Sequence, residues 1–117
     1  MKGGIYLKNG SFQDSGMMTL TNVQDISSFS FQNLICETLV IPETVINITF
    51  LAFSHCKIRN IVFLGDTQLE QDSFFECEGL ENIYVLEDNL EKYKRNRCKY
   101  FGYGDYQIKN IQEYNKR

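Results

Sequence analysis

Apolar and polar residues alternate along this chain in a pattern that returns every 21 or 22 residues. Three segments carry it: ISSFSFQNLICETLVIPETV, ITFLAFSHCKIRNIVFLGDT and LEQDSFFECEGLENIYVLED. Their first residues, Ile26, Ile48 and Leu69, are spaced 22 and 21 apart. Because apolar positions that recur at a fixed period of this length stack on one another in a coiled chain, the pattern predicts a repeat solenoid with one segment per lap.

Several further positions recur in every lap, and each forms a column of the predicted coil. A phenylalanine follows each lap start by five residues, at Phe31, Phe53 and Phe74. The next columns are Leu34, Cys56 and Cys77, and then Cys36, Ile58 and Leu80. Each lap also has an apolar triplet typical of a strand, namely Leu39-Val40-Ile41, Ile61-Val62-Phe63 and Ile83-Tyr84-Val85. A weaker lap with Met18 and Leu20 precedes them, so we expect about three and a half repeats over residues 17–87.

The segments outside the repeats are expected to cover the two ends of a single domain that spans residues 1–117. Residues 1–16 contain Asn9-Gly10 between apolar arms, which predicts a hairpin cap. Residues 88–117 predict a helical cap, in which Asp88 or Asn89 begins a helix that runs to about Arg97. A glycine-rich loop and a final strand or extended segment are expected to follow.

The stretches ITFLAFSHCKIRNIVF and LVIPETVINI resemble the BspA-like, or type 5, leucine-rich repeats. The resemblance covers about Met17 to Tyr93, and IYVLEDNLEKYKR is similar to the strand and short helix with which members often end. It implies a short right-handed leucine-rich-repeat solenoid with one parallel strand per lap. Leu64 and Leu86 depart from the family pattern, which usually has proline there, as at Pro42. Membership alone would also suggest a fragment of a cell-surface adhesion protein.

Ser54-His55-Cys56 contains the only histidine of the chain and could be taken for a nucleophile with its base. Cys56 shares its column with Leu34 and Cys77, however, so its thiol is expected in the interior, with Ser54 and His55 on the outside of a turn. We therefore predict no catalytic residues, and no metal or other cofactor, because His, Cys and carboxylates do not cluster at ligand spacing. Four free thiols are expected, although Cys56 and Cys77 on adjacent rungs could also meet in a disulfide.

Charge changes the picture of possible partners. A net charge of −3 disfavours direct nucleic-acid binding, and neither a membrane span nor a signal peptide is visible, so we expect a cytoplasmic protein, or a cell-surface one if the chain is part of a longer protein. Nine acids and no base lie between Asn60 and Glu91, whereas Lys92 to Lys99 hold five bases. The acidic run is either a set of solvated turns or a flank that steers a partner, with Glu70, Glu76, Glu78 and Glu81 as its candidate contacts.

The middle residues of the triplets, Val40, Val62 and Tyr84, are expected to point out of the sheet because side chains alternate along a strand. Leu64 and Leu86 should lie beside this column, with Asn60 and Asn82 at its border. An apolar outer face needs a cover. Either the C-terminal YQIKNIQEY folds back over it, or a second chain binds there, which could be another protein or a second copy. A register error of one residue would exchange the inner and outer columns.

These features predict a non-enzymatic protein-interaction module that binds a partner protein through its outer strand face and acidic flank. The acidic run alone supports an alternative, an inhibitor or nucleic-acid mimic that blocks a nucleic-acid-processing enzyme.

Overall fold

The structure is a computed structural model that describes residues 17–19 and 24–116. The predicted hairpin around Asn9-Gly10 lies outside the described residues, as does Leu20 of the weak lap. The elements in order are β1 (Met17–Thr19), β2 (Asp25–Ile26), β3 (Ile35–Ile41), β4 (Asn47–Ile48), β5 (Lys57–Phe63), β6 (Gln68–Leu69), β7 (Asn82–Val85), the 3-10 helix η1 (Glu87–Asn89), α1 (Leu90–Arg95), α2 (Arg97–Phe101), β8 (Gln107–Asn110) and α3 (Ile111–Asn115).

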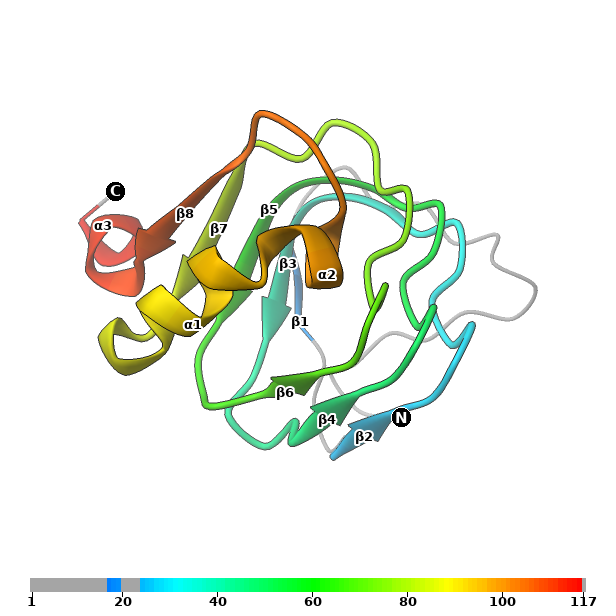
Figure 1. Cartoon of the computed structure of the whole chain (residues 1–117), viewed down its shortest axis with the longest axis horizontal. Helices are drawn as coiled ribbons and strands as arrows, with labels where there is room; N and C mark the ends of the chain where they lie inside the picture. Colours follow the sequence, from blue (N-terminus) through cyan, green and yellow to red (C-terminus); the bar gives the residue numbers. More distant parts are fainter. Residues whose placement is uncertain (1–16, 20–23, 117) are drawn as a thin grey trace.

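The described residues form a coil whose laps build two parallel sheets, with strand orders β1-β3-β5-β7-β8 and β2-β4-β6 (Figure 1). In the larger sheet Leu39 pairs with Ile61 and Ile61 with Ile83, so the predicted triplets are register partners on successive rungs. Met18 pairs with Leu39, which confirms that the weak lap belongs to the same sheet. The repeat solenoid and its register are therefore those that the apolar columns predicted.

Each lap contains two strands, where one was expected. Ile26, Ile48 and Leu69, the predicted lap starts, are partners in the smaller sheet of β2, β4 and β6. Each of these strands has only two residues, which is too short for the alternation by which strands are recognised. The columns were visible in the sequence, but their strand conformation was not.

A column of phenylalanine rings occupies the space between the two sheets. The ring centroids of Phe31 and Phe53 lie 5.1 Å apart, and those of Phe53 and Phe74 4.8 Å, with nearly parallel planes. Phe101 of α2 continues the column at 5.3 Å from Phe74. Tyr93 of α1 is buried beside it and donates its hydroxyl to the Thr67 carbonyl at 2.8 Å. Aromatic residues of both helices therefore pack on the core beyond the third lap, and Figure 1 shows where the two helices lie.

The turn between the two sheets uses the left-handed region of the backbone twice in each lap. Positive φ angles occur in two columns, Phe29, Leu51 and Asp72, and Asn33, His55 and Glu76. This conformation is uncommon for residues other than glycine. Hydrogen bonds from one lap to the next hold it, because the amides of Phe29, Leu51 and Asp72 donate to Leu51, Asp72 and Lys99 carbonyls at 3.1, 3.0 and 2.7 Å.

The C-terminal helix differs in detail from its prediction. It ends at Arg95, and a second short helix begins at Arg97, whereas one helix to about Arg97 was expected. The side chain of Asn89 forms no capping hydrogen bond. Leu90 and Tyr93 do pack toward the core, as their spacing predicted. The predicted final strand is β8, which pairs with β7 as a further rung.

Phe53 and His55 offer a test of the column assignment by stability. Phe53→Ala should lower the free energy of unfolding by about 3 to 5 kcal/mol, because it leaves a cavity between two stacked rings. His55→Asn should change it by no more than about 0.5 kcal/mol, because His55 is exposed and Asn33 adopts the same positive φ one lap earlier. Urea unfolding followed by circular dichroism measures both, and equal losses would contradict the core assignment of Phe53.

Candidate functional site

The predicted outer column is covered by the end of the chain. Val40, Val62 and Tyr84 form a cluster apart from the main core, which confirms that they point out of the sheet. Their exposed fractions are only 7, 0 and 4%, however, so the prediction that a partner can reach them is wrong. Ile111 and Tyr114 of α3 pack on the cluster, and the rings of Tyr84 and Tyr114 lie 5.2 Å apart. Of the two covers considered, the C-terminal segment is the one present.

The residues at the border of this column also differ in accessibility. Asn60 is buried and Asn82 half-buried, and their side chains form a ladder with Thr38. The Asn82 amide donates to Asn60 Oδ1 at 3.0 Å, and the Asn60 amide donates to Thr38 Oγ1 at 3.3 Å. Because these side chains hydrogen-bond to one another across neighbouring strands, they stabilise the sheet. Leu64 is 39% exposed and Leu86 half-buried, so Leu64 is the more accessible of the two.

The four glutamates of the acidic flank lie at different points around the third lap. Glu70 follows β6, Glu76 lies in the turn, and Glu78 and Glu81 precede β7. All four are exposed, but three contact other groups: Glu70 Oε1 accepts from the Phe50 amide at 3.1 Å, Glu76 Oε1 lies 3.4 Å from His55 Nδ1, and Glu81 Oε2 lies 3.5 Å from Arg59 Nε. They follow the path of the coil and do not form one uniform acidic patch.

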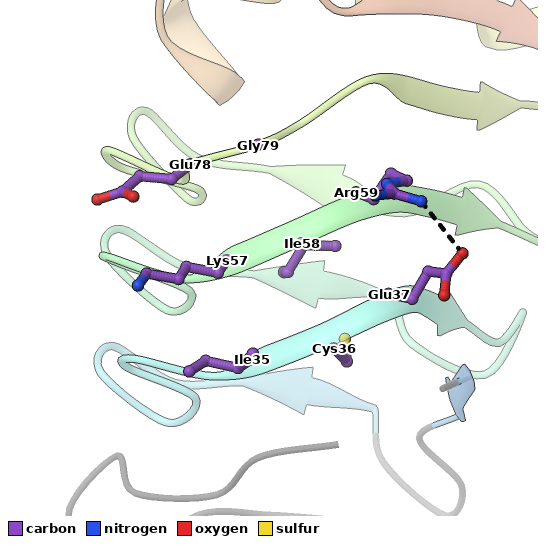
Figure 2. Close-up of a pocket in the computed structure, with 8 residues that line it drawn as sticks. All are labelled: Ile35, Cys36, Glu37, Lys57, Ile58, Arg59, Glu78 and Gly79. Atoms are coloured by element: carbon purple, nitrogen blue, oxygen red, sulfur yellow. Dashed lines mark ion pairs between the residues drawn. The ribbon is translucent and has the colours of Figure 1, made fainter. Parts of the chain in front are cut away.

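An open groove of about 320 Å³ crosses the first halves of β3 and β5, on the part of the larger sheet outside the α3-covered cluster. We call it the strand groove. Its eight lining residues come from three successive rungs: Ile35, Cys36 and Glu37; Lys57, Ile58 and Arg59; and Glu78 and Gly79 (Figure 2). Cys36 and Ile58 are buried and belong to the core, whereas the charged side chains are exposed. The groove therefore has a charged rim, and the half-buried Ile35 is its most accessible apolar side chain.

A column of alternating charge crosses this groove. Arg59 lies between two acids of the neighbouring rungs, with its Nη1 3.5 Å from Glu37 Oε2 and its Nε 3.5 Å from Glu81 Oε2. Figure 2 shows the Arg59 side chain reaching toward Glu37. Lys57 and Glu78 occupy neighbouring rungs, where they form a parallel bridge. Among the described residues neither has an ion pair within 4 Å, so these two charges face solvent.

Sequence reasoning missed the strand groove because side-chain alternation is interrupted inside β3. Cys36, Leu39 and Ile41 all belong to the main core, although Cys36 and Leu39 are three residues apart. A strict alternation would place them on opposite faces. The signal that could have found the groove is the column Glu37, Arg59 and Glu81, in which the sign of the charge changes at every rung.

Of the three residues Ser54, His55 and Cys56, only His55 is exposed, so the imidazole and the Cys56 thiol lie in different environments. His55 is exposed at a positive φ of 58°, where its imidazole contacts the edge of Phe75 and Glu76. Cys56 is fully buried and donates its thiol to the Phe31 carbonyl at 3.0 Å, as Cys77 does to Phe53 one lap later at 3.2 Å. Burial is the main reason that the pKa of the Cys56 thiol is raised, so the thiol stays protonated and is a poor nucleophile.

Ser54 corrects one prediction, because it is buried and not on the outer surface of the turn. Its hydroxyl oxygen has no hydrogen-bond partner among the described residues. An unsatisfied buried hydroxyl costs about 1 to 3 kcal/mol. This cost marks Ser54 as a site at which the chain can be made more stable.

Ser54→Ala should raise the free energy of unfolding by about 1 kcal/mol, because it removes that hydroxyl with little change in volume. Urea unfolding measures the difference. Ser73→Ala is the matched control, since the Ser73 hydroxyl donates to the carbonyl of Ile48 or Glu70, and its loss should lower stability. A loss of stability in Ser54→Ala would show that its hydroxyl has a partner.

Removing α3 should expose the outer column. A chain that ends at Asn110 should lose about 2 to 4 kcal/mol of unfolding free energy, because Val40, Val62 and Tyr84 lose their cover. It should also bind the apolar dye ANS, whereas a control chain that ends at Asn115 should behave as the full chain does. Unchanged stability and dye fluorescence after the longer truncation would show that α3 does not protect the sheet.

Within residues 17–19 and 24–116 no helix is long and apolar enough to cross a bilayer. The same residues contain no group of three or more His, Cys, Asp or Glu side chains placed to hold a metal ion.

Comparison with protein families identifies the repeats. The family described as "BspA type Leucine rich repeat region" matches residues 6–114 in six copies. Neither the curated proteins nor the solved structures gave a match. The matched residues include β8, which adds a rung beyond the three and a half laps expected from the apolar columns. The chain belongs to the BspA-type leucine-rich repeat family.

Proposed function

We propose that this chain is a non-enzymatic module that binds a partner protein across the strand groove. Leucine-rich repeats generally mediate interactions between proteins, and the family match extends over most of the chain. The observation that carries the proposal is the open charged groove on the larger sheet beside the outer column that α3 covers. A partner that docks there meets the half-buried Ile35 and a rim of both charges.

The charges that line the groove indicate which charges a partner segment would need in order to bind there. Glu37, Arg59 and Glu81 already satisfy one another in part, and exposed pairs of this kind contribute little to stability. Lys57 and Glu78 face solvent on adjacent rungs, which lie about 4.8 Å apart. A complementary segment would present an acid to Lys57 and a base to Glu78, with an apolar side chain over Ile35. Such pairing selects the partner and its register more than it adds affinity.

The same surface gives less support to nucleic-acid mimicry. A mimic of the phosphate backbone needs a continuous row of negative charge. Here Arg59 lies between Glu37 and Glu81 of the neighbouring rungs, and His55 lies beside Glu76. The mixed pattern favours a protein partner.

A double charge exchange in the groove tests the proposal without changing the net charge. Lys57→Glu with Glu78→Lys should weaken capture of the partner by about tenfold or more, because it replaces two attractive contacts with repulsive ones. The matched control is Glu91→Lys with Lys94→Glu on the exposed face of α1, which should leave capture unchanged. Affinity purification of the tagged chains from the cells of origin, with quantitative mass spectrometry, measures the difference.

A protein recovered equally by the native chain and by both double variants would contradict binding at the strand groove. A protein lost only with the α1 control would move the interface to that helix. Circular dichroism of each variant establishes that it is folded before capture is compared.

A further inference from the structure

A second hollow lies between the turn of the third lap and the loop that joins α2 to β8. Its volume is about 400 Å³. Its lining includes three aromatic residues, Phe75, Phe101 and Tyr103, and the acids Asp72 and Glu76. Phe101 is fixed in the core, whereas Tyr103 is 93% exposed. We call this hollow the aromatic pocket, and it shares no lining residue with the strand groove.

The loop that carries Tyr103 is held in place by Arg97. The guanidinium of Arg97 donates to the carbonyls of Gly104 at 3.1 Å and Tyr106 at 2.7 Å, and it stacks over the Tyr106 ring at 4.3 Å. The Tyr106 hydroxyl in turn bonds to the Gly102 carbonyl. These contacts bracket Tyr103 on both sides. Tyr103 therefore lies on a braced loop, and its ring is exposed.

The charged residues in the lining of the pocket are both acids, Asp72 and Glu76. No lysine, arginine or histidine lines it, and Lys99 contributes its backbone carbonyl to the Asp72 amide at 2.7 Å. The Glu76 carboxylate lies 3.4 Å from His55 Nδ1, and the His55 and Phe75 rings lie 5.7 Å apart. Aromatic faces beside carboxylates attract cations, through the negative face of the ring and through the formal charge.

We propose that the aromatic pocket binds a cationic side chain, a lysine of a partner protein. Tyr103 and Phe75 would contact the methylene stem and the ammonium group, while Asp72 and Glu76 would balance its charge. The occupant follows from charge complementarity, because acids and aromatic rings line the pocket with no base among them. This inference goes beyond the proposed function, since it stands on residues that the strand groove does not use.

The test is a titration of the full chain, labelled with ¹⁵N, with the capped peptide acetyl-Gly-Lys-Gly-amide. The amide signals of Gly102, Tyr103 and Gly104 should shift on binding, because they lie on the braced loop. The matched peptide with norleucine in place of lysine has the same stem without the charge and should leave these signals unchanged. Equal shifts with both peptides would overturn the proposal, because the pocket would then bind the apolar stem without any contribution from the charge.

Variants of the pocket separate the contribution of the aromatic ring from that of the two acids. Tyr103→Leu should weaken lysine-peptide binding by about fivefold through loss of the ring face, while Tyr103→Phe should bind as the native chain does. Asp72→Asn, which suits the positive φ at that position, and Glu76→Gln should each weaken binding and reduce its dependence on salt. Tyr103 is almost fully exposed, so its variants are expected to fold normally.

Unchanged affinity in Tyr103→Leu, or an absence of loop shifts in the native chain, would overturn the proposal. The exchange of Lys57 and Glu78 should leave the lysine-peptide titration unaltered, because neither residue lines the pocket. Failure of the groove experiment and failure of the pocket experiment are therefore distinguishable.

Discussion

The parallel register between laps is the constraint on which the rest of the structure depends. Each lap must return directly beside the previous one, with matching residues opposite each other, so that their strands can pair. The corner between the sheets is one residue shorter after β5 than after β3, since Ile48 pairs with Leu69 at 21 residues and Leu39 with Ile61 at 22. Gly65 lies in that corner, where a Cβ would approach Glu43 Cα to 2.6 Å. The lost residue is regained before β7, where Gly79 adopts a φ of 74°. Glycines thus absorb both departures from a constant lap.

The parallel register also determines which side chains lie at the surface, where they are accessible to a partner. Within a rung, the positions that stack between the sheets are committed to the core, and the turn columns at positive φ project outward. Asn33, His55 and Glu76 show the consequence, because three chemically unrelated side chains occupy one structural position. The only histidine is therefore an exposed turn residue that pairs with Glu76, while the thiol that follows it in sequence is buried and protonated.

Much of the fold could be predicted from the sequence, because stacked columns leave a repeated signal: the triplet register, the lap starts and the inward Leu90 and Tyr93 were all visible. The candidate site was much less predictable. Whether Val62 and Tyr84 were exposed depended on where the last residues of the chain lie, and a short helix such as α3 has no periodicity that reveals its docking face. The columns placed Cys36 and Leu39 at apolar positions, but they did not show that Ile35, Glu37 and Arg59 line an open groove. Tyr100, Tyr103 and Tyr106 look alike in sequence, yet only Tyr103 is exposed.

The C-terminal segment determines which surfaces remain for a partner. β8 adds a rung, α3 covers the outer column, and aromatic residues of α1 and α2 pack on the core, so that the strand groove and the aromatic pocket are left open. The two sites meet along the third lap, where Glu76 and Cys77 line the pocket and Glu78 and Gly79 line the groove. This stretch is held by the bridge to Lys57 and by the thiol of Cys77, which donates to the Phe53 carbonyl. A partner that reached both sites would therefore contact one continuous segment of the third lap. Its affinity would gain because the two contacts are linked.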